Sequence, residues 1–192
     1  MKAPGKIRII SGQWRGRPLP VPTHSSLRPT PDRVRETLFN WIGARIRNSS
    51  CLDLFAGTGA LGFESASRGA SKVWMVEYDS KLCENLRSQC QVFGATQVEV
   101  IQADAISWIK NSNEAMDYIF LDPPFDKYQF EELLRQLETT SLLKPTTHLY
   151  FECTLQVGKQ LEENYIQTNG AWRRIHFALA GRVSYNLYSR AE

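Results

Sequence analysis

Residues 51–62 read Cys-Leu-Asp-Leu-Phe-Ala-Gly-Thr-Gly-Ala-Leu-Gly, an apolar run that passes directly into a glycine-rich turn. Gly57, Gly59 and Gly62 have the G-x-G-x-x-G spacing with which a buried strand turns into a helix against a nucleotide-like ligand. Glu77 ends the next apolar run, near the distance at which an acid holds a ribose. The spacing therefore predicts a nucleotide-type cofactor at this turn. The simpler alternative is a strand-to-helix turn without a ligand.

From residue 51 onward, short apolar runs alternate with amphipathic stretches. The runs predict strands at residues 51–55, 72–77, 97–102, 116–121 and 147–152. This alternation indicates parallel strands with right-handed crossovers, so the expected fold class is α/β with a doubly wound, mostly parallel, Rossmann-like sheet. Residues 172–177 and 182–188 predict a closing antiparallel hairpin, which brings the sheet to seven strands. Ligands of such sheets lie beyond the carboxyl ends of the strands.

The N-terminal part of the chain departs from this alternation. Residues 7–22 predict a small β-hairpin between glycines and prolines. Thr30-Pro31-Asp32 predicts a helix start in which Thr30 is the N-cap residue. Apolar residues then recur at helical spacing, whereas Arg33 and Arg35 lie off that stripe. We therefore expect this helix to dock on the core and to present cations.

Charge is distributed unevenly along the chain. Residues 1–47 hold ten lysines and arginines against two acids, a net charge of +8, and because the whole chain has +3, residues 48–192 sum to −5. This asymmetry predicts a basic extension at residues 1–47 with an anionic partner, and a cofactor-binding domain at residues 48–192. A solvated arm without a partner is the alternative. Trp14 is expected to pack the hairpin onto the domain rather than to stack on a base.

The cysteines and the apolar runs bear on the cellular compartment. Cys51, Cys83, Cys90 and Cys153 form no Cys-x-x-Cys pair and have no histidine at zinc-ligand spacing. The first three fall in predicted strand or helix cores, which indicates buried free thiols in a reducing cytoplasm, and we expect no metal. The apolar runs are too short for a membrane span or a signal peptide. A cytoplasmic protein without a membrane partner is the resulting prediction.

Asp53 favours one cofactor over another. It interrupts a strand that is expected to be buried, where even a neutral polar group costs roughly 2–7 kcal/mol, so it needs a cationic or hydrogen-bond-donating partner. The methionine part of S-adenosylmethionine supplies an ammonium, whereas the pyrophosphate of NAD would repel the carboxylate. We expect S-adenosylmethionine, with Glu77 at its ribose and Asp104 at its adenine amine. Asp104 as a helix N-cap is an alternative that is compatible with that contact.

The fourth predicted strand ends in Asp122-Pro123-Pro124-Phe125. Two successive prolines lack backbone donors and hold their predecessors extended, so the carbonyls of Asp122 and Pro123 are free to face a pocket. These two residues can grip both N–H bonds of an exocyclic base amine and aim its lone pair at a methyl group. The same acceptors stabilise the charge that develops on the nitrogen, and Phe125 is expected to stack on a base that is flipped out or already single-stranded. A rigid turn with a core phenylalanine is the alternative.

A family resemblance rests on residues 8–12, 14–17, 27–30, 34–36 and 38–40, and then on residues 53–59, 76–77 and 122–125. With these motifs, essentially the whole chain resembles the RsmD family of bacterial 16S ribosomal RNA guanine-N2 methyltransferases. The resemblance implies that S-adenosylmethionine is converted to S-adenosylhomocysteine as the N2 amine of one guanine is methylated. The implied partner is 16S rRNA in the small ribosomal subunit or its assembly intermediate. We expect a monomer and no DNA partner.

The resemblance and the motifs together give the complete set of predicted site residues. The predicted cofactor contacts are Asp53, Phe55, Ala56, Gly57, Thr58, Gly59, Glu77, Tyr78, Asp104 and Ala105. The predicted catalytic residues are Asp122, Pro123, Pro124 and Phe125. The cations expected to contact the rRNA backbone are Lys6, Arg8, Arg15, Arg17, Arg28, Arg33 and Arg35.

Three other functions fit parts of this pattern. A DNA or RNA adenine-N6 methyltransferase would use the same Asp-Pro-Pro-Phe grip, although no loop here is long enough for the target-recognition insertion that DNA enzymes usually carry. An NAD-dependent oxidoreductase would share the glycine spacing. An inactive RNA-binding or assembly factor would share the basic extension. Guanine rather than adenine follows from the resemblance, because the grip suits either amine.

Overall fold

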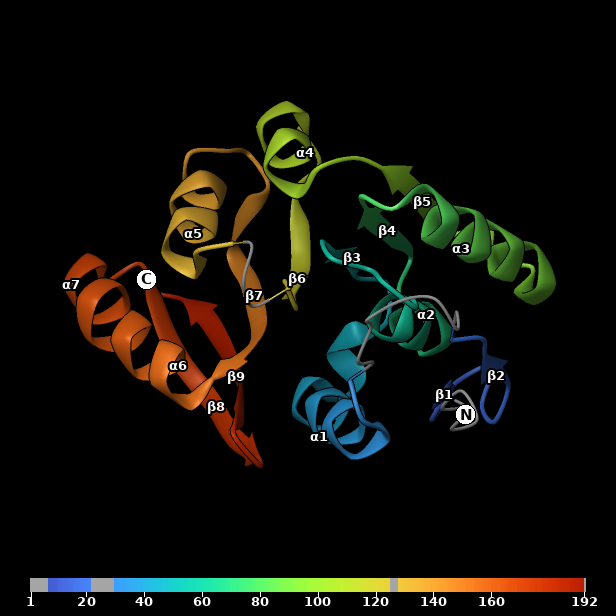
Figure 1. Ribbon diagram of the computed structural model, residues 1–192, viewed down its shortest axis with the longest axis horizontal. Helices are drawn as coiled ribbons and strands as arrows, with labels where there is room; N and C mark the ends of the chain where they lie inside the picture. The colour runs from blue at the N-terminus through green and yellow to red at the C-terminus, as the bar shows by residue number, and fades with distance from the viewer. Residues whose placement is uncertain (1–6, 22–29, 125–127, 192) are drawn as a thin grey trace.

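A seven-stranded sheet runs through the middle of the computed structural model, which describes residues 7–21, 30–124 and 128–191 (Figure 1). Its strands are β3 (Ser50–Asp53), β4 (Lys72–Glu77), β5 (Val98–Gln102), β6 (Met116–Leu121), β7 (Leu143–Thr154), β8 (Trp172–Ala180) and β9 (Val183–Arg190). They lie in the order β5-β4-β3-β6-β7-β9-β8. Neighbours among the first five are parallel, and β9 is antiparallel to both β7 and β8. The predicted doubly wound sheet with a closing hairpin is confirmed.

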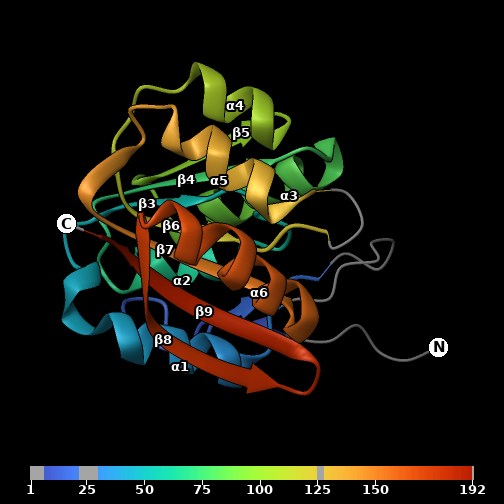
Figure 2. The ribbon, with the colours of Figure 1, turned by 90° about the vertical axis from the view of Figure 1, so that its left-hand side faces the viewer.

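Helices cover both faces of this sheet (Figures 1 and 2). One face packs against α1 (Asp32–Ile42), α2 (Ala60–Ser67) and α3 (Ser80–Phe93), and the other against α4 (Ala105–Asn111), α5 (Phe130–Glu138) and α6 (Leu155–Leu161). Short helical turns follow α1 and α6 at Gly43–Ile46, Glu162–Ile166 and, as α7, Gln167–Asn169. Side chains alternate along each strand, so Cys51 joins the first cluster and Leu52 the second. Among the described helices, none has an apolar stretch long enough to span a bilayer.

The N-terminal hairpin is fastened to α2. Its strands β1 (Ile7–Arg8) and β2 (Pro18–Leu19) are antiparallel, as predicted. The backbone N–H of Trp14 donates to the hydroxyl of Ser67 at 2.9 Å, and the carboxylate of Glu64 accepts from two further hairpin amides at 2.8 and 3.0 Å. Trp14 is buried and stacks on Phe93 with ring centroids 5.0 Å apart, so the prediction that it packs the hairpin onto the domain is confirmed. The boundary between two domains at residue 47 stays a prediction. Residues before and after this boundary belong to the same hydrophobic cluster.

Thr30 does not cap α1, contrary to the prediction. The helix begins at Asp32, Pro31 holds the N-cap position, and no side chain caps the first turn. The Thr30 hydroxyl instead donates to Oδ2 of Asp122 at 3.4 Å. An N-cap hydroxyl accepts from backbone amides of the first turn, whereas the Thr30 hydroxyl donates to a carboxylate that follows a distant strand.

Arg35 is not presented to solvent, so its prediction as an rRNA contact is wrong. Its side chain is fully buried, and its guanidinium donates to Oδ1 of Asp32 at 2.7 Å and to the carbonyl oxygen of Arg8 at 2.8 Å. It also lies 3.5 Å from the buried carboxylate of Glu64. A buried carboxylate needs a cationic partner, and Arg35 together with Arg68 supplies one. Arg35 therefore joins α1, the hairpin and α2.

Gly12→Ala is expected to destabilise the fold more than Gly16→Ala does. Both glycines have a positive φ, +85° and +79°, so either alanine bears a strain of about 1–2 kcal/mol. At Gly12 the added Cβ would also lie 1.9 Å from the carbonyl oxygen of Ser67, whereas at Gly16 it would meet no described atom within 4 Å. In urea unfolding we expect the Gly12 variant to be less stable than the Gly16 variant by about 1–3 kcal/mol. Equal destabilisation would contradict the close packing of the hairpin on α2.

All four cysteines are free thiols. Cys51 and Cys83 are buried, as predicted, and so is Cys153. Cys90 is partly exposed, because its position on α3 lies at the border of the buried stripe rather than inside it.

Candidate active site

The glycine turn joins β3 to α2 and is tied to the end of β4. Glu77 accepts from the backbone N–H of Gly57 at 2.8 Å and from that of Asp79 at 2.9 Å. Gly59 is the N-cap of α2 with φ of 75°, in the left-handed region that favours glycine. Gly62 packs so closely on β4 that a Cβ there would lie 2.4 Å from the Met75 side chain. The turn is thus shaped by local packing, and Glu77 fixes it to the neighbouring strand.

Asp53 is buried at the end of β3 and faces α2. Its Oδ2 accepts from the backbone N–H of Gly62 at 2.9 Å. Burial raises the pKa of Asp53 from 3.8 to about 7, the Gly62 bond opposes this shift, and the charge of Glu77 adds to it. The protein itself therefore supplies a hydrogen-bond donor to one oxygen of Asp53, the kind of partner that the sequence predicted for this acid. A cation beside Asp53 would still favour its ionised form.

Asp104 forms a second acceptor at the end of β5, next to two aromatic rings. Its Oδ1 accepts from the backbone N–H of Ser107, which makes it the N-cap of α4, and its Oδ2 accepts from the Tyr128 hydroxyl at 2.9 Å. The Ser107 amide is the main cause that holds the pKa of Asp104 below its usual value. Tyr128 in turn packs on Phe55 with centroids 4.9 Å apart. The capping role is confirmed, and the predicted adenine contact stays compatible with it.

Asp122 follows β6 directly and is partly exposed, whereas Pro123 is buried and Pro124 exposed. The carboxyl group of Asp122 itself is buried, which raises the pKa of Asp122 well above its usual value; the charges of Glu152 and Asp53 add to this, and the Thr30 hydrogen bond opposes it. The Asp122 carboxyl group therefore lies close to two other acidic side chains. Perturbation of this kind is common where acids and bases act.

Glu152 is the main residue that the sequence interpretation missed. The parallel register pairs Phe120 with Tyr150 and then Leu121 with the next residue of β7, so the following positions place Asp122 beside Glu152. Glu152 is buried, and its Oε1 accepts from the Tyr150 hydroxyl at 2.9 Å. An acid at the end of the otherwise apolar run Leu149–Cys153 was the available signal. The same kind of signal distinguishes Asp53 in its own strand.

The remaining predicted site residues differ in their exposure to solvent. Ala56 and Ala105 are buried, and the backbone N–H of Ala56 donates to the carbonyl oxygen of Val76. Thr58 is partly exposed, and Tyr78 is largely exposed at 72%. Lys6, Arg28 and Phe125 lie outside the described residues.

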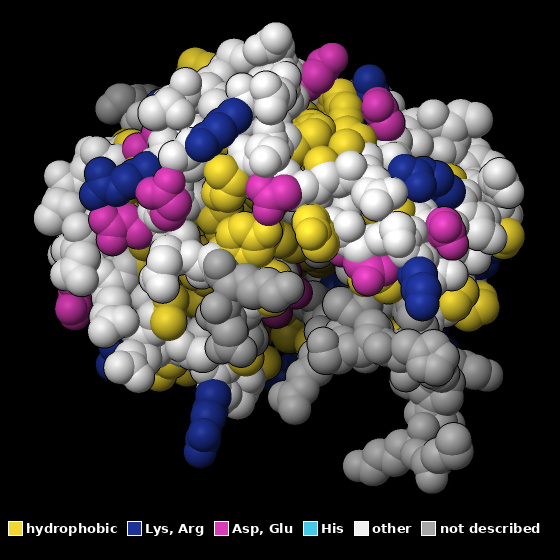
Figure 3. Space-filling view, turned by 45° about the horizontal axis from the view of Figure 1, so that its top comes forward, with side chains coloured by type: hydrophobic (Ala, Val, Ile, Leu, Met, Phe, Trp, Pro, Cys, Tyr) yellow, Lys and Arg dark blue, Asp and Glu magenta, His cyan; other side chains and the backbone are white. Residues whose placement is uncertain are grey.

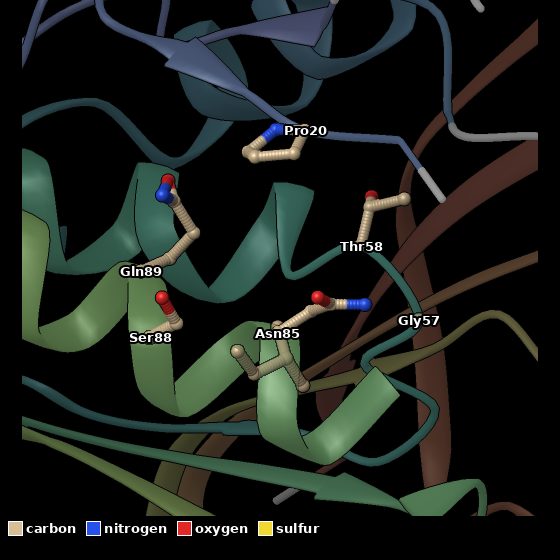
Figure 4. A pocket seen from close by; sticks show the side chains of 7 residues that line it. Pro20, Gly57, Thr58, Asn85, Ser88 and Gln89 are labelled. Carbon is tan, nitrogen blue, oxygen red and sulfur yellow. The ribbon is translucent and has the colours of Figure 1, made fainter. Parts of the chain in front are cut away.

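A small hollow of about 60 Å³ lies on the α3 side of the glycine turn (Figure 4). Gly57 and Thr58 line it from the turn, Pro20 from the hairpin, and Asn85 and Gln89 are among its α3 residues. Ligand pockets are typically about 300–1,000 Å³, so this hollow is too small for a nucleoside. Neither Glu77 nor Asp104 lines it. It therefore touches the predicted cofactor site only at Gly57 and Thr58.

The predicted rRNA-contacting cations differ in their surroundings. Arg8, Arg15 and Arg33 are exposed, whereas Arg17 lies over the Phe93 ring at 4.4 Å and donates to a backbone carbonyl of α3. Arg8 and Arg15 share a hollow of about 310 Å³ with acids of α1. On another face, Figure 3 shows hydrophobic side chains gathered near the middle with acidic ones beside them, while lysines and arginines stand singly. The exposed arginines Arg8, Arg15 and Arg33 therefore stay the predicted contacts for an anionic partner.

The residues present fit S-adenosylmethionine as a ligand. Its ammonium, its ribose hydroxyls and its adenine amine are all hydrogen-bond donors. Asp53, Glu77 and Asp104 are acceptors at the ends of three neighbouring parallel strands, where ligands of such sheets lie. The acid at each position matches the polarity of the group that it would hold.

Known proteins share both the sequence and the fold. A family model described as Conserved hypothetical protein 95 matches residues 7–189. Ribosomal RNA small subunit methyltransferase D of Escherichia coli is 40% identical over 97% of this chain and 91% of its own, and the protein of the same name from Haemophilus influenzae is 40% identical over 97% and 95%. The solved structure of Escherichia coli yhhF has a TM-score of 0.84 and 38% identity, covering 97% of this chain and 98% of that one. The chain therefore belongs to the RsmD family of methyltransferases, as its motifs predicted.

Proposed function

We propose that this protein transfers a methyl group from S-adenosylmethionine to the N2 amine of a guanine in 16S rRNA, acting as a monomer on the small ribosomal subunit or its assembly intermediate in the cytoplasm. The observation that carries the proposal is the position of Asp122-Pro123-Pro124 at the end of β6, next to the strand that ends in Asp53 and the glycine turn. Its family relatives include two proteins named as small-subunit rRNA methyltransferases.

The residues of this chain divide the work between cofactor and base. Asp53 would hold the ammonium, Glu77 the ribose and Asp104 the adenine amine, with Phe55 and Tyr78 alongside. When bound, S-adenosylmethionine supplies an electrophilic methyl group on its sulfonium. The glycine turn is already fixed to Glu77, so the binding surface is largely formed before the ligand arrives.

The Asp-Pro-Pro segment would orient the attacking amine. The Asp122 carboxylate and the Pro123 carbonyl accept from its two N–H bonds and direct the nitrogen lone pair away from the ring, toward the methyl group. As the nitrogen becomes positively charged, Asp122 stabilises it and then receives the proton that the amine must release. The raised pKa of Asp122 suits a group that takes up a proton during the reaction.

Replacing the three exposed arginines of the extension, Arg8, Arg15 and Arg33, by glutamine is expected to weaken binding to small-subunit rRNA and to flatten its salt dependence. For every phosphate that is no longer neutralised, the slope of log K against log salt should become shallower by about 0.7–0.9. Filter binding between 50 and 300 mM salt, which spans roughly the range where such interactions dominate, measures the slope. Lys81, Lys110 and Lys159, exposed on other helices, provide a control triple variant of equal charge. An unchanged slope in the arginine variant, or an equal change in the lysine control, would contradict this role for the extension.

The methylated nucleoside tests the proposed function directly. Unmodified small subunits are incubated with the protein and labelled S-adenosylmethionine, and the RNA is digested to nucleosides. We expect the label in N2-methylguanosine. Label in N6-methyladenosine would favour the adenine alternative, and label only in protein would overturn an RNA substrate altogether.

A further inference from the structure

We infer that Glu152 selects guanine, by accepting a hydrogen bond from the ring N1–H next to the amine that Asp122 holds. This inference rests on the proposed function and deepens it, because the Asp-Pro-Pro grip by itself suits any exocyclic base amine. It assigns to Glu152 a specificity role that neither the glycine turn nor the Asp-Pro-Pro motif supplies.

The register of β6 and β7 carries the geometry. Phe120 pairs with Tyr150 and Leu121 with Phe151, and the next residue of each segment is Asp122 and Glu152, close enough for the charge of Glu152 to raise the pKa of Asp122. Phe120 and Tyr150 belong to the cluster on the α1–α3 face, and the alternation of side chains puts the two acids on that same face. Neighbouring strands lie about 4.8 Å apart, so carboxylates that extend from adjacent positions can converge on the edge of one base.

Two hydroxyl groups lie next to the Glu152 carboxyl group and oppose the effect of its burial. The Tyr150 hydroxyl donates to its Oε1 at 2.9 Å. Burial raises the pKa of Glu152, and hydrogen bonds from Tyr150 and Thr30 oppose that shift, since donors that approach a carboxylate favour its ionised form. In that form every lone pair of the carboxylate accepts. A base that donates two hydrogen bonds would therefore fit between Asp122 and Glu152.

Guanine meets this requirement, whereas the other bases with exocyclic amines do not. Its N2 amine is flanked by the ring N1–H, so the two groups present donors side by side. In adenine and cytosine the ring nitrogen next to the amine is an acceptor, and its lone pair would face the Glu152 carboxylate. A ligand that leaves buried polar groups of the site without a hydrogen-bond partner is rejected strongly. Discrimination would thus come from mismatched hydrogen-bonding groups rather than from the size of the base.

The test uses 2-aminopurine, which keeps the amine of guanine but has an acceptor at N1. Small subunits are reconstituted with 16S rRNA that carries guanine or 2-aminopurine at the methylated position, and kcat/KM is measured for the wild type and for Glu152→Gln. We expect the wild type to prefer guanine by about 100-fold. In Glu152→Gln the guanine rate should fall by about 10- to 100-fold while the 2-aminopurine rate changes less than about threefold, so that the preference collapses.

Glu138→Gln serves as the matched control. Glu138 also accepts from a tyrosine hydroxyl, that of Tyr165, but on the α5 side away from this site, and its variant should keep the guanine preference. An equal fall on both bases in Glu152→Gln would mark a structural role and overturn the inference. If the Glu152 variant does not fold, the wild type still decides, because equal rates on guanine and 2-aminopurine would overturn it. Absence of N2-methylguanosine from wild-type reactions would overturn the proposed function as well.

Discussion

Asp122→Ala is expected to lower kcat for methyl transfer by about 10²- to 10³-fold, the usual effect of removing one group that stabilises charge in a transition state. The affinity for S-adenosylhomocysteine should change less than about threefold. The reason is the division of the site: Asp122 follows β6 and would face the amine, whereas Asp53 and Glu77 end β3 and β4 around the glycine turn. Single-turnover kinetics and isothermal titration calorimetry measure the two quantities separately.

Asp117→Ala is the control for that variant. Asp117 lies near the opposite end of the same strand, where its carboxylate accepts from the backbone N–H of Ser50 at 2.8 Å and from Lys144 at 2.7 Å. Its removal should lower stability and leave kcat nearly unchanged. If Asp122→Ala weakened cofactor binding as much as it slowed transfer, the separation of roles between the strand ends would be refuted.

Asp53→Asn is expected to weaken S-adenosylhomocysteine binding at neutral pH by about 10- to 100-fold, because a hydrogen bond to an ionised group contributes about 1.5–3 kcal/mol. The amide oxygen keeps an acceptor for the Gly62 N–H, which lies 2.9 Å from Oδ2 of Asp53, so α2 should hold its place. Calorimetry of the two proteins, with circular dichroism to verify the fold of the variant, measures this effect.

The wild type should also bind the ligand more tightly as pH rises toward 7. Burial, the main cause, raises the pKa of Asp53 from 3.8 to about 7, so below that pH the carboxyl must release a proton before it pairs with an ammonium. Affinity should increase by up to about tenfold per pH unit and then level off. Asp53→Asn should lack this rise. In the free protein the same shift lowers the free energy of unfolding as pH rises from 3.8 to about 7, since the folded state holds the proton more tightly. A wild-type affinity independent of pH would contradict the pairing.

Most strands of the sheet could be predicted from the sequence, because each depends on a pattern of neighbouring residues. The strands predicted at 72–77 and 116–121 match β4 and β6 residue for residue. A short apolar run between polar residues is typical of a buried strand. The strand predicted at 51–55 ends earlier, at Asp53, where the chain begins its turn toward α2. β7 is longer than predicted at both ends, because its amino end pairs with β6 at Leu143 and β9 extends the pairing at its carboxyl end. The position of the glycine turn followed from spacing.

Contacts between segments that are far apart in the sequence could not be predicted in this way. Arg35 has the position of an exposed residue on a helical wheel, yet the buried carboxylate of Glu64 draws it inward. Thr30 is of a residue type that often caps helices, yet its hydroxyl donates to the carboxylate of Asp122. Glu152 joins the site only through the register of β6 and β7. In each case an acid far along the chain decides the outcome, and local propensity carries no information about it.

A crystal structure with S-adenosylhomocysteine bound tests the central arrangement most directly. We expect the ligand over the turn at Gly57–Gly59, with its amino group within hydrogen-bonding distance of Asp53, its ribose at Glu77 and its sulfur facing Asp122. A ligand bound elsewhere, or at this turn with the Asp122 carboxylate directed away from the sulfur, would contradict it.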